Sequence, residues 1–154
     1  FNSMMGQALI LLVENNGDVN EWDMGLPPVE FANKYWGPYL KTLSIKQKNG
    51  SSYAYIYFPD GTSVTMLKGV CMDCIFDING NKNPNIEGRD RFRFLACSKD
   101  VTSWCPNKGW CTYRSDQQQS RDHYLEQCKN DGKYCSALLE VDNWEFRDDY
   151  PYKL

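Results

Sequence analysis

Side chains that carry oxygen recur between Asp77 and Asp90, in a stretch that also holds two glycines and a proline. It lies between two short apolar runs and has little to bury except Ile78 and Ile86. Calcium takes roughly six to eight oxygen ligands, and carboxylates and amide carbonyls are its usual ligands in proteins. The pattern therefore predicts a possible Ca²⁺ site, with these candidate ligands: Asp77, Asn79, Asn85 and Asp90.

Internal hydrogen bonding is the competing explanation for the same loop. Asn and Asp side chains bond to neighbouring backbone groups in turns, which would use these oxygens without any ion. The loop carries three acidic and two basic residues, a low negative charge for a tight cation site. Any calcium affinity is therefore expected in the extracellular range, on the order of 10⁻⁴ to 10⁻³ M.

Seven cysteines in one chain of this size are the second group with chemistry to offer. Cys105 and Cys111 flank one short turn-rich loop, and Cys128 and Cys135 flank another, so both spacings favour disulfides and an oxidising compartment. Zinc is the alternative. Cys71-Met-Asp-Cys74 has metal-finger spacing, but no second such pair occurs and the chain has one histidine.

The other cysteines depend on how two strands pair. Strands are expected over 70–76 and 92–97, and the oxygen-rich loop joins them as a long hairpin. Antiparallel pairing then sets Cys71 near Cys97 and leaves Cys74 as the odd thiol. Sequence alone does not fix the connectivity.

The first helix has more apolar surface than a single sheet can cover. Apolar residues recur at helical spacing from Phe1 to Leu12, and Asn15–Asp18 ends the pattern. The segment 8–13 is apolar on every side, although a helix on one sheet needs only one apolar stripe. We expect a second partner for this helix, with these candidate contact residues: Phe1, Met4, Met5, Ile10, Leu11 and Val13.

The remaining elements predict an α+β fold in a single domain over 1–154. Pro27-Pro28 opens a short or broken helix over 29–40. Strands over 52–58 and 63–67 flank a turn at 59–62, which makes an antiparallel sheet of about four strands with the pair above. Short helices are expected over 121–128 and 136–142. The disulfide-bridged loops fall in the carboxyl-terminal half.

Several function classes have little support in the composition. A net charge of −3 argues against nucleic acid as a partner, because such proteins carry basic patches. No apolar run reaches the roughly 20 residues of a membrane span. His123 sits among polar residues, and no glycine-rich phosphate loop occurs. We expect a protein that is not an enzyme.

The loop also carries a motif that resembles bacterial type IV pilin-like and pseudopilin proteins. Its pattern is Asp-x-Asn-Gly-x-x-x-Pro-Asn-x-x-Gly-x-Asp-x-Phe, and this chain supplies these residues: Asp77, Asn79, Gly80, Pro84, Asn85, Gly88, Asp90 and Phe92. The segments 31–40, 58–63 and 134–151 are similar to other parts of the family. Asn143 stands where the family usually has Gly, a mild change because Asn tolerates positive φ.

The resemblance implies the head of a filament subunit, with one long helix on an antiparallel sheet. It places Phe1 in the second half of that helix, after a segment held in the inner membrane before assembly. The partners would be other pilin subunits in a pilus-like or secretion filament, and the location extracellular, cell-surface or periplasmic. The alternative is a secreted or surface adhesin that binds carbohydrate or protein, with an aromatic platform of Trp104, Trp110, Tyr113 and Tyr134.

Overall fold

The structure, a computed structural model, describes residues 1–106, 109–114 and 118–153. These residues contain four α-helices, six strands and three short 3-10 turns. The helices are α1 (Asn2–Asn16), α2 (Pro28–Tyr35), α3 (Arg121–Asn130) and α4 (Cys135–Val141). The strands are β1 (Ser44–Lys46), β2 (Tyr53–Tyr57), β3 (Ser63–Leu67), β4 (Cys71–Asp77), β5 (Arg91–Cys97) and β6 (Trp110–Thr112).

The strands form one antiparallel sheet in the order of the chain, β1-β2-β3-β4-β5-β6. The predicted α+β class is therefore confirmed. The expected number of about four strands is wrong, because β1 and β6 were missed. Each has only three residues, too few to show an alternating pattern.

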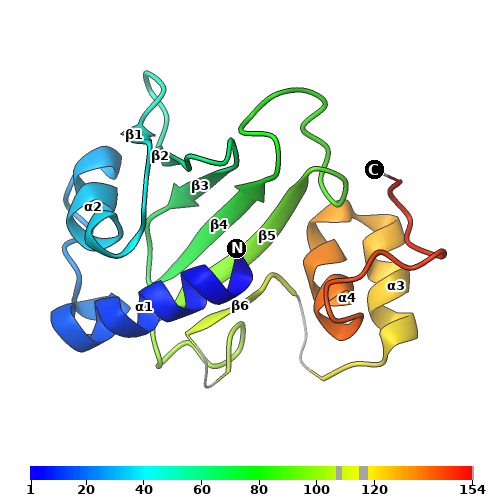
Figure 1. Cartoon of the computed structure of the whole chain (residues 1–154). Coiled ribbons are helices and arrows are strands. Elements are labelled where there is room, and N and C mark those ends of the chain that lie inside the picture. The colour runs from blue at the N-terminus through cyan, green and yellow to red at the C-terminus, as the bar shows by residue number, and fades with distance from the viewer. Residues whose placement is uncertain (107–108, 115–117, 154) are drawn as a thin grey trace.

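One face of the sheet carries the main core, and α1 lies across it (Figure 1). Alternate residues of a strand point to opposite faces, and β5 shows the consequence. Phe92, Phe94 and Ala96 belong to the main core, whereas Leu95 and Cys97 join a smaller cluster with Cys105 and Cys111. The cysteine-rich segment after β5 thus packs on the face away from α1.

The three other helices pack at the two ends of the sheet (Figure 1). α2 contacts β1 and β2, and Pro28 sits at its start, as the sequence predicts. It ends at Tyr35 and a 3-10 turn follows over Gly37–Tyr39, which confirms the expected short or broken helix. At the other end α3 and α4 pack against each other, and α4 contacts β5 and β6.

The turns form where the sequence predicts them. In the turn between β2 and β3, the carboxylate of Asp60 accepts hydrogen bonds from the N–H and hydroxyl of Thr62, at 3.0 and 2.7 Å. These bonds hold the pKa of Asp60 below its ordinary value. The loop joining β4 and β5 spans the predicted stretch, and the two strands pair from Cys71 opposite Cys97 to Asp77 opposite Arg91.

Candidate functional site

Asp90 organises the loop between β4 and β5. Its carboxylate is buried and accepts three hydrogen bonds from within the loop. The donors are the side-chain amide of Asn79 at 3.0 Å, the backbone N–H of Asn85 at 2.8 Å and that of Ile86 at 2.5 Å. One carboxylate thus fixes both halves of the loop, as the self-satisfied turn predicts.

Asp77 is also buried, but its partner is a cation. Its Oδ2 atom accepts from Nε of Arg91 at 2.9 Å, and its Oδ1 atom accepts from the N–H of Asn79 at 3.0 Å. The same guanidinium donates to the side chain of Asn81 at 2.8 Å. Arg91 therefore supplies the positive charge that a metal ion would otherwise supply to Asp77.

The four predicted calcium ligands come together in the loop but are not equivalent. Oδ1 of Asn79 and Oδ1 of Asn85 are buried without a hydrogen-bond partner, so both are available to a cation. Both carboxylate oxygens of Asp90 already accept hydrogen bonds, and Asp77 is paired with Arg91. Within the described ranges, no cluster of three or more acidic, histidine or cysteine side chains is placed to hold a metal. The hydrogen bonds of the loop are those of a self-satisfied turn, and the calcium site stays a prediction.

The loop is also fastened to the end of the chain. The hydroxyl of Tyr150 donates to the backbone oxygen of Gly88 at 2.5 Å, and burial raises the pKa of that hydroxyl. Gly88 has φ +81°, and a Cβ there would lie 2.8 Å from the sulfur of Cys135. Glycine is therefore required where the loop passes α4 and the final segment.

The six predicted contact residues of α1 separate into distinct groups. Met5 is fully buried in the protein's own core, so its assignment to an intermolecular contact is wrong. Phe1 and Val13 are half-buried against that core. Three side chains face solvent: Met4 is 39% exposed, Ile10 60% and Leu11 47%. We call these three the exposed ridge of α1.

The disulfide predictions are confirmed. Cys71 pairs with Cys97, Cys105 with Cys111 and Cys128 with Cys135. Cys74 is the free cysteine, as expected. Its thiol is fully buried, and burial raises its pKa, so it stays protonated and unreactive at neutral pH.

Of the four aromatic residues suggested as a binding platform, Trp110 lies apart from the others. Trp104 and Tyr113 line one hollow on the face away from α1, and Tyr134 lies beside Tyr113. Trp110 is buried on the α1 side, where its ring stacks on Phe94 and its Nε1 donates to Asn2 at 2.7 Å. Trp104 is exposed beside the cysteine-rich cluster on the other face. Tyr113 and Tyr134 pair with ring centres 5.6 Å apart.

A cavity lined mainly by aromatic residues is a feature that the sequence does not predict. It lies between the start of α1, the strands β4 and β5, and the segment after α4. Its lining comes from three distant parts of the chain, so no local motif announces it. The nearest signal in the sequence is the group of aromatic residues from Trp144 to Tyr152.

Comparison with known proteins places the chain in a family without assigning an activity. A family model described as a family of unknown function, DUF6613, matches residues 1–154. The chain belongs to this family. No curated protein and no solved structure matches it. In the part of the chain that the structure describes, no helix has both the length and the apolar character to cross a membrane.

Proposed function

We propose that this protein is a structural subunit of a bacterial filament, either a type IV pilus-like or a secretion filament, built by contacts between α1 helices. The observation that carries the proposal is the exposed ridge of α1. The helix already buries Met5, Ala8, Leu9 and Leu12 against its own sheet. A second apolar surface on the same helix is what a helix shared with a neighbour needs.

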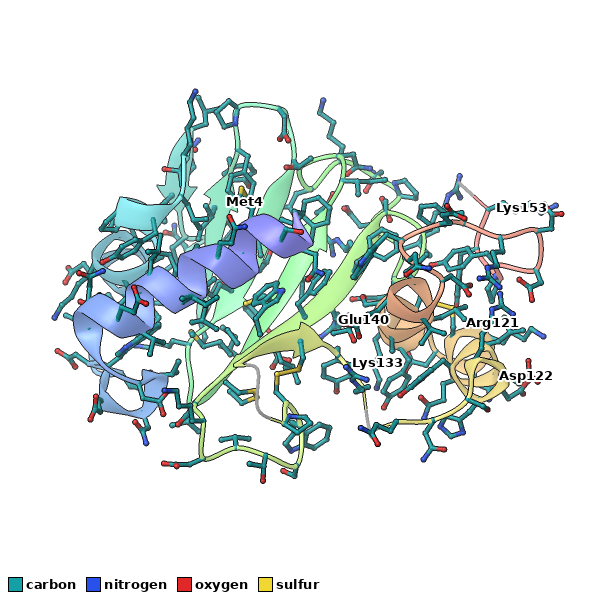
Figure 2. The ribbon with its side chains drawn as sticks, turned by 60° about the horizontal axis from the view of Figure 1, so that its bottom comes forward. Met4, Arg121, Asp122, Lys133, Glu140 and Lys153 are labelled. Atoms are coloured by element: carbon teal, nitrogen blue, oxygen red, sulfur yellow. A yellow bond between two sulfur atoms is a disulfide. The ribbon has the colours of Figure 1, made fainter. Side chains whose placement is uncertain are left out.

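The ridge stands out by its position as well as its exposure. Met4 and Leu11 are seven residues apart, two helical turns, and therefore lie on one line along the helix. Ile10 lies about 100° further around the helix from Leu11. Figure 2 shows Met4 on the outward side of α1. Contact with water costs roughly 25 cal/mol per Å² of apolar area, and a neighbouring helix would remove that cost.

Two further observations support the proposal. The pilin-like motif occupies the ordered loop between β4 and β5, where Asp90 accepts hydrogen bonds from two other residues of the motif, Asn79 and Asn85. Three disulfides fit an extracellular, cell-surface or periplasmic location. In this proposal the protein is not an enzyme, and its partners are other pilin subunits, with anchoring in the inner membrane before assembly.

Substitution of the ridge in the full-length protein, produced in its host, tests the proposal. Leu11→Lys places a charge in the proposed contact, so filaments seen by electron microscopy should be lost. Leu11 is exposed in the isolated chain, so the purified protein should melt at nearly the same temperature.

Leu43→Lys is the matched control, because Leu43 is 70% exposed and lies outside α1. The same substitution there should leave filaments intact. Normal filaments with both Leu11→Lys and Ile10→Lys would contradict the proposal.

A further inference from the structure

The aromatic cavity has the size and shape of a small-molecule site. Its volume is about 380 Å³, within the range of roughly 300–1,000 Å³ typical of ligand pockets. Most of its lining is aromatic, and the ring-bearing residues are Phe1, Phe76, Phe92, Phe94, Trp144 and Phe146. Trp144 is 39% exposed, Phe146 46% and Ile78 42%, so the cavity opens to solvent at its rim.

The aromatic residues that line the cavity pack against one another. Phe1 stacks on Phe76 with ring centres 3.9 Å apart, and Phe94 stacks on Trp144 at 5.8 Å. Phe92 meets Phe146 edge to face at 6.2 Å. Contacts of this kind are favourable for aromatic pairs, and they keep the cavity formed without a ligand.

The backbone at Trp144 is unusual for a large side chain. Asn143 has φ 54° and Trp144 has φ 65°, two successive residues in the left-handed region. The N–H of Trp144 donates to the oxygen of Leu139 at 2.7 Å, which closes the end of α4. Asn accepts this conformation easily, but for Trp it is strained, and such strain is concentrated at functional positions.

The segment that follows is fixed to the rest of the fold. Arg121 on α3 forms two hydrogen bonds to Asp149, at 2.7 and 2.8 Å, and two to Asp142. Figure 2 shows Arg121 on α3, beside the closing segment of the chain. Together with the bond from Tyr150 to Gly88, these contacts hold the chain on both sides of Phe146.

The polarity of the lining defines the ligand. Among the described residues that line the cavity no side chain is charged, and the polar side chains are those of Asn2 and Ser3. Oδ1 of Asn2 accepts from Trp110, which leaves the amide NH₂ group of Asn2 as a donor. A charged ligand would lose its hydration without gaining a charged side chain as a partner, and most hydroxyls of a sugar would also remain unpaired.

We infer that this cavity is a binding site for an uncharged aromatic ring that carries a single polar group at one edge. The flat rings of Trp144 and Phe76 suit a planar apolar ligand, and Asn2 offers one hydrogen bond to its polar edge. The three residues of the exposed ridge do not line the cavity. The inference therefore goes beyond the proposed filament role, and its test has a separate readout.

Calorimetric titration of the purified chain with 2-naphthol tests the inference, and 2-naphthoate is the anionic comparison. Saturable one-to-one binding of 2-naphthol is expected, with 2-naphthoate at least tenfold weaker. Trp144→Ala and Phe146→Ala should each lower the affinity for 2-naphthol at least tenfold. Trp104→Ala is the matched control, since that Trp has similar exposure at 44% but lines a different hollow, and it should leave binding unchanged.

A variant at the rim distinguishes a site from a general loss of structure. Ile78→Lys places an ammonium group beside the bound ring. The affinity for 2-naphthoate should therefore rise at least tenfold relative to the affinity for 2-naphthol. An unfolded variant would not reverse a preference. Absence of saturable 2-naphthol binding, equal affinity for the two probes, or full binding by Trp144→Ala would overturn the inference.

Discussion

Arg121 joins the last segment of the chain to the helical pair through two carboxylates. Its guanidinium bonds to Asp142, which is buried, and to Asp149, which is half exposed. Hydrogen bonds from Arg121 hold the pKa of Asp149 below its ordinary value of 3.8, and the charge of Arg147 acts in the same direction. The bonds also raise the pKa of Arg121, so this residue stays charged.

This pairing predicts a loss of stability in acid. Asp149 has a lower pKa in the folded protein than in the unfolded chain, so its contribution is fully present above pH 3.8 and is lost as the pH falls through the folded value. Asp149→Asn should flatten the pH dependence of the free energy of unfolding in that window. Denaturant melts between pH 2 and pH 7 measure it, and an unchanged slope would contradict the assignment.

Residue types in the loop could be predicted well, but their partners could not. The sequence identifies Asp77, Asn79, Asn85 and Asp90 as oxygen donors grouped in one turn. The register that sets Cys71 near Cys97 also sets Asp77 opposite Arg91, but whether the two side chains form an ion pair depends on their positions in the folded loop. The missing piece was three-dimensional geometry, since both residues were visible in the sequence.

At the scale of elements, two glycines with similar positive φ angles allow the cost of the backbone conformation to be distinguished from the cost of a steric contact. Gly80 in the β4–β5 loop has φ +69°, and a Cβ there would lie 2.5 Å from the backbone oxygen of Gly61. Gly50, in the turn before β2, has φ +74° with open space around it. A left-handed conformation costs an L-residue about 1–2 kcal/mol.

Gly50→Ala should therefore lower the free energy of unfolding by about 1 kcal/mol. Gly80→Ala should cost at least twice as much, about 2 kcal/mol or more, because backbone atoms must also move. Urea melts of the two variants give the comparison. Equal losses would show that the β4–β5 loop yields easily where it passes Gly61.

Calcium is the second test of the same loop. A site centred on Asp90, with a dissociation constant on the order of 1 mM, would add about 1.4 kcal/mol of stability when the ion is in tenfold excess. The melting temperature should then rise with millimolar calcium and fall back with chelator. Asp90→Asn should abolish the response, whereas Asp60→Asn, in the exposed turn between β2 and β3, should keep it. An unchanged transition in the parent protein would remove the ion from the loop.

For the molecule as a whole, the sequence was most informative where its patterns are local. The hairpin between β2 and β3, the two disulfides that close short loops and the broken helix around Gly37 follow from neighbours along the chain. The short strands β1 and β6 and the side of α1 that Met5 faces depend on distant segments. The aromatic cavity depends on them most, because Phe1, Phe92 and Trp144 meet only after folding.

The bridge between Cys71 and Cys97 ties together the outer ends of β4 and β5, with the whole connecting loop inside the closed ring. If a protease cut this loop, the two fragments would therefore stay joined, both by the disulfide and by the pairing of β4 with β5. In a non-reducing gel the cut protein would migrate as one species, and a reducing thiol would be needed to separate the fragments.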